Sequence, residues 1–438
     1  MMTSVPFIRA LRLRDATSLV IGCIVGVGIF RTSSAIATQL QSPTLILAVW
    51  VIGGVLSLCG ALCYAELAAM FPRSGGDYVY LTNTYGSFWG FLFGWTKLFV
   101  ERTGTIAILG IVFAEYLGRV LGYRAEVTRW VAALGVVLLT GVNARGVQWG
   151  KYVQNFFTVL KVSALGSIVA VGLFAQRGTE PLWAFSSQVW SDLSIWHSLG
   201  MALIFVLWTY GGWTEATYVA EEIQRPQRNI PLAIVSGVLI TTGLYLLVNT
   251  IYLWYIPLHE LPQINLVASA MMEKAIGRIG AVFIGWMVAC SAFGALNGYI
   301  LTGARILYAI GQDHPVFAKL AVIHPRYHTP AVALWLNAVV AILLIFTKTF
   351  EQIVTYSTVV ISVFFLMAVL GVLVLRRTQP TRPRPYKTWG YPLMPLIYGM
   401  VMGGFILDVC LKQPKESIFG FGFLALGLPL YWLSRTMR

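Results

Sequence analysis

Charged side chains are scarce in this sequence: Asp, Glu, Lys and Arg make up 11% of its 438 residues, against about a quarter in an ordinary soluble domain. Hydrophobic residues make up 58% and fall into blocks close to the ~20 residues that a helix needs to cross a bilayer. This composition excludes a water-soluble globular protein. It predicts an all-α polytopic membrane protein with about twelve transmembrane helices, in which residues 1–438 form a single membrane domain.

The apolar blocks are separated by short polar connections, which set the expected bounds of the spans. The predicted spans cover residues 15–39, 44–70, 86–117, 127–145, 152–176, 197–222, 231–256, 278–311, 330–347, 350–376, 391–411 and 418–435. The stretch 259–277 is more polar than the spans. It is predicted to be either a short surface helix or a loop.

Cysteine and the motifs of catalytic sites are scarce as well. The five cysteines include no CxxC pair, and nearly all lie in apolar segments, which indicates small core residues rather than disulfides or metal ligands. No HExxH, Walker or GxSxG pattern occurs. Pro325 follows His324, so His324 and His328 are not expected to share a metal-binding helix face. We therefore expect no enzyme activity, no metal site and no cofactor.

Acidic residues are few relative to basic ones, 17 against 31, which gives a net charge of +14. If the N-terminus is cytoplasmic, most basic residues fall on the inner side, as the positive-inside rule requires. This predicts a multi-pass protein of the cell membrane (plasma or inner) with both termini cytoplasmic, and it argues against nucleic-acid binding. The densest basic cluster, Arg376, Arg377, Arg382, Arg384 and Lys387, is interpreted as topogenic and lipid-facing.

Glycine, by contrast, is plentiful and interrupts two spans. The first span contains GCIVGVG (Gly22 to Gly28), and the sixth contains TYGGW (Thr209 to Trp213). Each opens a block of five spans, so residues 15–176 and 197–376 are predicted to be inverted repeats, with 391–435 as two extra helices. Paired interruptions in equivalent spans indicate a transporter binding site near the membrane midplane.

A helix that is interrupted inside a membrane exposes polar backbone groups, which need partners. The amides that restart the helix after Gly28 suit an anion such as a carboxylate, and the carbonyls that end the preceding halves suit an ammonium. An α-amino acid carries both groups on one carbon and could use both interruptions. The alternative is that these glycines serve helix packing, because Gly22 and Gly26 also form a GxxxG pattern. The matching positions of the two interruptions weigh against that alternative.

Lys161 lies about 13 Å into the fifth predicted span if that helix begins at Tyr152, which is deep for a lysine that reaches toward the surface. We interpret it as part of an ion or coupling site, with a bundle-facing ion pair as the alternative. Burial disfavours the charged ammonium, which leaves proton coupling open.

Four other charged positions give weaker signals. The neighbours Glu101–Arg102 in the third span point to different sides of a helix, and no role is predicted for them. The pair Glu221–Glu222 lies near Arg225 and Arg228. It is predicted to form an ordinary solvated ion-pair cluster.

Six sequence motifs, in the right order along the chain, resemble the L-type amino-acid transporters of the amino acid-polyamine-organocation (APC) superfamily. They are IGCIVGVGIF (Ile21 to Phe30), YAELAAMFPRSGGDYVYL at the end of the second span, YGGWTEATYVAEEIQRPQRNIPLAI (Tyr210 to Ile234), FGALNGYILTGARILYA (Phe293 to Ala309), HPRYHTP (His324 to Pro330) and LGLPLYW (Leu426 to Trp432). The resemblance covers essentially the whole chain. It implies a five-plus-five inverted repeat in which the first and sixth helices are broken.

The resemblance also implies how a substrate would bind. Its carboxylate would meet amides around Gly26, Val27 and Gly28, and its ammonium would meet carbonyls of Ile24, Trp208 and Gly211. The implied substrate-binding residues are Ile24, Val25, Gly26, Val27, Gly28, Trp208, Thr209 and Gly211.

Two positions depart from the family pattern. Trp208 replaces a smaller aromatic residue that closes the pocket from outside, and Val27 replaces a serine. Lys161 looks like the family lysine whose ammonium takes the place of a sodium ion, which implies independence from sodium.

The function implied by the resemblance is sodium-independent transport of neutral L-amino acids by alternating access. The resemblance favours an exchanger, with a proton-coupled or facilitative carrier as the alternative. A non-transporting amino-acid sensor is the alternative of another class. Animal members of the family bind a heavy chain through a cysteine between spans 3 and 4, and the loop Gly118 to Thr128 has no cysteine. No disulfide-linked heavy chain is expected. The expected partners are an amino-acid substrate and the lipid bilayer.

Overall fold

The computed structural model describes residues 6–175, 193–347 and 350–436. In these ranges every regular element is a helix, and one isolated bridge pairs Leu11 with Ile223. The predicted all-α fold class is confirmed.

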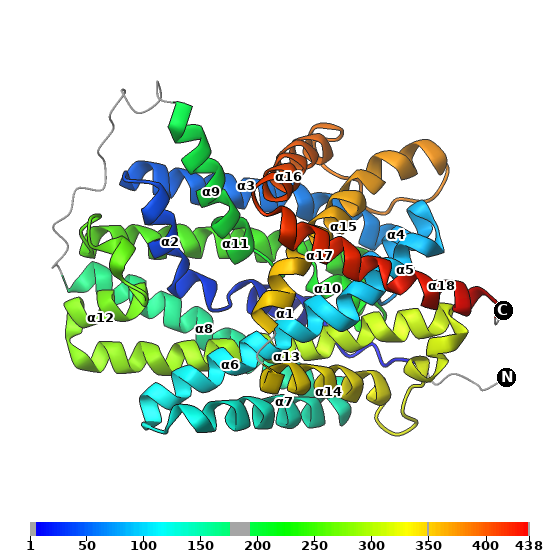
Figure 1. Ribbon diagram of the computed structural model, residues 1–438, viewed down its shortest axis with the longest axis horizontal. Helices are drawn as coiled ribbons and strands as arrows, with labels where there is room; N and C mark the ends of the chain where they lie inside the picture. The colour runs from blue at the N-terminus through cyan, green and yellow to red at the C-terminus, as the bar shows by residue number, and fades with distance from the viewer. Residues whose placement is uncertain (1–5, 176–192, 348–349, 437–438) are drawn as a thin grey trace.

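Figure 1 shows the helices in their order along the chain. The first half contains α1 (Leu13–Ile24), η1 (Gly28–Phe30), α2 (Thr32–Gln39), α3 (Pro43–Met70), α4 (Asp77–Tyr85), α5 (Ser87–Thr96), the π-helical η2 (Lys97–Glu101), α6 (Arg102–Leu121), α7 (Thr128–Ala144) and α8 (Val147–Phe174). The second half contains α9 (Leu193–Thr209), α10 (Glu215–Tyr218), α11 (Pro226–Tyr255), α12 (Val267–Ile276), α13 (Arg278–Asp313), α14 (Ala331–Thr347), α15 (Phe350–Thr378), α16 (Leu393–Lys412), α17 (Pro414–Ala425) and α18 (Gly427–Thr436).

Nine helical stretches in the described ranges are long and apolar enough to cross a membrane. Two shorter apolar helices, Ser198–Thr209 and Ala331–Thr347, and the interrupted α1–α2 account for the other predicted spans. The stretch 259–277 contains α12 and a 3₁₀ turn, Leu261–Gln263, so the helical alternative is confirmed there. Its position between α11 and α13 makes it a cap on one end of the bundle.

The interior of the bundle contains the interrupted helices. Figure 1 shows α1 and α10 near the middle, and α1 packs against α8, α11 and α13. The window of α3 that could span a membrane is 67% buried, against 17% for α16. Because a helix that is apolar on all sides can be buried in protein or face lipid, this contrast identifies α3 as an inner helix and α16 as an outer one.

A short helix that was not predicted, α4, follows a glycine turn. Gly75 and Gly76 have φ of +118° and +51°, which side-chain-bearing residues rarely adopt. A Cβ on Gly76 would also lie 2.6 Å from Thr217 Oγ1. The turn places the Asp77 side chain in the interior, where the hydroxyl of Tyr218 donates a hydrogen bond to it.

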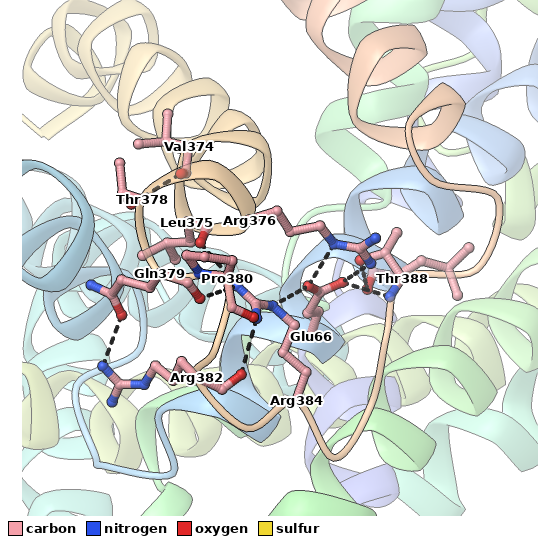
Figure 2. Close-up of polar contacts among 11 residues, drawn as sticks. Glu66, Val374, Leu375, Arg376, Thr378, Gln379, Pro380, Arg382, Arg384 and Thr388 are labelled. Carbon is pink, nitrogen blue, oxygen red and sulfur yellow. Dashed lines mark hydrogen bonds and ion pairs between the residues drawn. The ribbon is translucent and has the colours of Figure 1, made fainter.

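The basic cluster after α15 differs from the expectation. Figure 2 shows the Arg376 guanidinium bonded to Glu66 of α3, at 3.0 and 2.7 Å, and the backbone amide of Thr388 bonded to the same carboxylate at 2.6 Å. Arg384 lies 3.4 Å from Glu66 and also donates to the carbonyl of Leu375 near the end of α15. The lipid-facing interpretation is therefore wrong for Arg376 and Arg384, which attach this segment to a buried carboxylate.

Candidate functional site

Two helices at the centre of the bundle are interrupted where glycines were expected to interrupt them. The helix α1 ends at Ile24, and a 3₁₀ turn and α2 continue the chain from Gly28. The helix α9 ends at Thr209, and α10 begins at Glu215. Between them, Gly212 has φ of +109°, a conformation that glycine adopts without the clash a Cβ would introduce.

The two interruptions touch each other. A Cβ on Gly212 would lie 2.8 Å from the carbonyl carbon of Cys23, and one on Gly28 would lie 2.9 Å from Cγ2 of Thr209. The hydroxyl of Thr209 lies 3.0 Å from that of Thr32. At these points glycine is required by close contact, as the packing alternative predicted. At Gly26 a Cβ would meet only the Ile24 carbonyl oxygen, at 3.9 Å, so packing does not require that glycine.

Backbone amides at the first interruption are unused. Among the backbone hydrogen bonds of residues 6–175, 193–347 and 350–436, none has the amide of Val27 or Gly28 as its donor. The amide of Gly26 is already engaged, 2.7 Å from the Ile24 carbonyl. Val27 and Gly28 therefore present free donors at the start of a helical segment, where the helix dipole adds positive potential.

Several carbonyl oxygens at the interruptions accept hydrogen bonds from other groups of the protein. The hydroxyl of Tyr245 donates to the Ile24 carbonyl at 2.9 Å, and that of Ser291 lies 3.2 Å from the carbonyls of Val25 and Gly26. The Trp208 carbonyl accepts from the Gly211 amide at 3.1 Å. Because a carbonyl has two lone pairs, the oxygens of Val25, Gly26 and Trp208 can each accept a further hydrogen bond. The Ile24 oxygen already accepts two, from Tyr245 and from the Gly26 amide.

Lys161 of α8 lies beside the first interruption. Its side chain is fully buried, and Nζ donates a 2.6 Å hydrogen bond to the Gly22 carbonyl in the last turn of α1. The hydroxyl of Ser291, from α13, contacts the same segment four residues later along the chain. The amine of Lys161 and the hydroxyl of Ser291 thus connect α8 and α13 to the broken helix.

The side chain of Trp208 does not cover the interruptions. It is 61% exposed, although the neighbouring Thr209 is 3% exposed and Tyr210 is fully buried. Gly26 and Val27 are half-buried. Part of the first interruption and the side chain beside the second are therefore exposed in this structure.

The sequence did not assign partners to the charged groups near the second interruption. Arg102 forms two hydrogen bonds with Glu215, at 3.0 and 3.2 Å, and both side chains are buried. The hydroxyl of Thr302 also donates to Glu215. The rings of Tyr218 and Tyr299 lie 5.2 and 4.9 Å from the guanidinium carbon. Helices α6, α10 and α13 are thereby joined just after the second interruption.

The prediction of a solvated cluster at Glu221–Glu222 is wrong for Glu222. This carboxylate and Arg305 of α13 are both fully buried and form hydrogen bonds of 2.7 and 3.1 Å. Arg305 also donates to the Leu301 carbonyl at 2.8 Å. The partner is distant in sequence, and the nearby Arg225 and Arg228 are not used.

Comparison with known proteins identifies the family. The family model described as amino acid permease matches residues 11–418. The chain belongs to this family. The b(0,+)-type amino acid transporter 1 of Mus musculus is 32% identical over 428 residues, covering 96% of this chain and 87% of that relative. The serine/threonine exchanger SteT of Bacillus subtilis is 28% identical, covering 95% and 94%. The human large neutral amino acids transporter small subunit 2 is 31% identical, covering 96% and 79%.

Family membership confirms the resemblance found in the sequence motifs. It also confirms that the protein is a transporter rather than an enzyme. With the apolar helices of the structure, it establishes a multi-pass membrane protein.

Proposed function

We propose that this permease exchanges neutral L-amino acids across the cell membrane by alternating access, without sodium. The observation that supports this most directly is the contact between the two interrupted helices, with unused amides on one side and carbonyls on the other. Relatives over nearly the whole chain are named for the transport or exchange of amino acids, including serine, threonine and large neutral ones.

The charged head of the substrate would be bound by backbone groups. The amides of Val27 and Gly28 would receive the carboxylate, favoured by the positive end of the restarted helix. The second lone pair of the Trp208 carbonyl would receive the ammonium. The Ile24 carbonyl would join it by giving up one of its two present hydrogen bonds, from Tyr245 or from the Gly26 amide. The Gly211 carbonyl at the second interruption is a further acceptor. Val25, Gly26 and Thr209 would form the walls of this site, and the side-chain pocket would lie toward Trp208.

Lys161 would take the place of a bound sodium ion. Its ammonium connects α8 to the Gly22 carbonyl at 2.6 Å, which is the kind of connection that a bound metal ion would otherwise make. A covalently attached cation needs no sodium gradient to fill its site. Its hydrogen bond would hold α1 in place until substrate binds.

The side chains and backbone at one end of the bundle would form the closed gate. Leu11 exchanges backbone hydrogen bonds of 2.9 and 2.8 Å with Glu222 and Gln224, and Arg73 pairs with Asp313 at 3.0 Å. If the N-terminus is cytoplasmic, this is the inner gate, and the exposed Trp208 lies on the open outer side. We propose that both termini are cytoplasmic in the plasma or inner membrane.

The repeat organisation and the absence of a covalent partner complete the proposal. Residues 15–176 and 197–376 would be the inverted repeats, because α1 and α9 are each the interrupted first helix of their half. Residues 391–435 would add two helices outside the repeats. The loop 118–128 has no cysteine, so the carrier would function without a disulfide-linked heavy chain.

Purified protein in liposomes tests the proposal. Labelled serine or leucine is supplied outside, with unlabelled amino acid or none inside, and choline replaces sodium in parallel samples. We expect uptake that requires internal amino acid and is indifferent to sodium. Uptake that ignores internal amino acid would replace exchange by proton-coupled or facilitative transport, and binding without uptake would favour a sensor. Competition by each of the twenty amino acids then defines the side-chain preference.

A further inference from the structure

Arg31 is a charged residue inside the first interrupted span. It lies three residues after Gly28 and eight before Gln39, the last residue of α2, which places its Cα about 12 Å from the C-terminal end of that helix. Its side chain is exposed. Charged side chains at such depth are costly in hydrocarbon and almost always face a polar interior or a water-filled cavity.

The guanidinium of Arg31 has no protein partner among residues 6–175, 193–347 and 350–436, where neither an ion pair nor a side-chain hydrogen bond involves it. Thr32, the next residue, contacts Thr209 at 3.0 Å, and Trp208 beside it is 61% exposed. Arg31 and Trp208 therefore flank the contact between the two interruptions. An exposed arginine at this place is best accounted for by water on the open side of the site.

Two buried hydroxyl groups, one of them within electrostatic range of Arg31, are also unused. Tyr116 of α6 and Tyr252 of α11 are 4% and 0% exposed, and in the described ranges neither hydroxyl has a hydrogen-bond partner. Arg31 lies within electrostatic range of Tyr116, as do Arg119 and Glu115, and Tyr116 lies within range of Tyr252. Buried polar groups without partners are rare in native proteins and call for an explanation.

A carboxylate is the ligand that this group of residues fits. Arginine binds carboxylates through paired donors, and tyrosine hydroxyls can donate further hydrogen bonds to the same oxygens. Arg31 also directly precedes α2, so the positive end of that helix adds to its charge. Lys161 differs, because its ammonium is fully buried and already bound to the Gly22 carbonyl.

We propose that Arg31 is a second carboxylate-binding residue, at the mouth of the substrate site. It attracts the carboxylate of an incoming amino acid on the open side, before that group reaches the amides of Val27 and Gly28. This inference rests on the proposed function. The carboxylate has two sources, the α-carboxylate of every amino acid or the side-chain carboxylate of an acidic one.

The test compares Arg31→Ala and Arg31→Lys with a matched control, Arg124→Ala. Arg124 is also exposed and lies just beyond the end of α6. Arg124→Ala therefore removes one positive charge, as Arg31→Ala does, but outside the interrupted span. Counterflow of labelled serine gives KM and kcat in liposomes, with glutamate and serinamide as competitors. Equilibrium binding of serine and glutamate to the detergent-solubilised full chain is measured in parallel.

If the α-carboxylate is the ligand, Arg31→Ala raises the KM for serine at least about fivefold with little change in kcat. Arg31→Lys restores part of the loss, and Arg124→Ala behaves like the wild type. If the side-chain carboxylate is the ligand, only competition and binding by glutamate weaken. Added salt raises the wild-type KM more than that of Arg31→Ala, because salt screens the attraction.

Unchanged KM and unchanged binding of both amino acids in Arg31→Ala would overturn the proposal. An equal loss in Arg124→Ala would also overturn it, because the effect would then be one of overall charge. If the wild type shows no counterflow but binds serine, exchange is refuted, and the binding constants still decide the role of Arg31.

Discussion

Breaking the buried ion pair between Arg102 and Glu215 should cost more stability than breaking a surface ion pair of this protein. Both side chains are at most 3% exposed, and the pair forms two hydrogen bonds. Removing one member leaves the other charge buried and uncompensated, which costs about 3–5 kcal/mol. Glu215→Gln and Arg102→Met are therefore both expected to destabilise the protein by that amount.

The expected shift in melting temperature follows from the size of the chain. At about 2.1 cal/mol/K of unfolding entropy per residue, 438 residues give about 0.9 kcal/mol/K, so each single variant should melt about 3–5 °C lower. Intrinsic tryptophan fluorescence of the detergent-solubilised protein, heated at a fixed rate, measures the shift. Glu260→Gln is the control, because Glu260 and Lys274 also lie 2.7 Å apart but are 44% and 42% exposed. No measurable shift is expected there.

The double variant Arg102→Met/Glu215→Leu separates two explanations. If the cost of a single variant comes from a charge left without its partner, replacing both members by apolar residues of similar volume recovers most of the stability. If the cost comes from lost contacts, the two losses add. Single variants that melt within 1 °C of the wild type, or a double variant that loses the sum, would refute the reasoning.

Three further outcomes are expected. Lys161→Ala should abolish or uncouple counterflow, and wild-type rates across a pH series would contradict the role assigned to the lysine. Gly212→Ala should lower the melting temperature, since φ is +109° there and a Cβ would meet backbone 2.8 Å away, whereas Gly26→Ala has room and should fold normally. The hydrogen bond from Lys274 holds the pKa of Glu260 below its ordinary value. The pair therefore stabilises the folded protein above the ordinary pKa of about 4.3, and this stabilisation is lost as the pH falls through the lower pKa of the folded state. Exchange by Glu260→Gln should therefore match the wild type from about pH 5 to 8.

Local sequence features were sufficient to predict the apolar spans and the two interruptions, although not the short helix α4. Apolar blocks of the right length identify the spans, because membrane crossing imposes that length whatever the neighbours are. Gly26 and Gly211 lie inside such blocks, where a glycine-rich segment weakens a helix. The expected interruption at Gly22–Gly28 and the observed end of α1 at Ile24 agree for that reason.

Partners of buried charges could not be predicted in the same way. Glu222 has arginines three and six residues later, yet it pairs with Arg305, which is 83 positions away. Glu66 pairs with Arg376 over 310 positions. A solvated carboxylate can use any nearby cation, but a buried one requires a partner that reaches the same interior point. That point is fixed by helix packing, which a single sequence does not reveal.

The contacts between the two broken helices fall into two groups, one on each side of the interruptions. On one side, α1 is joined to the segment after α10 by the backbone pairing of Leu11 with Ile223. On the other side, α2 is joined to α9 by the contact of Thr32 with Thr209. At each end, one broken helix is thus connected to the other, and the glycine segments lie between the two ends. Alternating access requires one end to open while the other stays closed, and contacts that pair the two helices separately at each end meet this requirement.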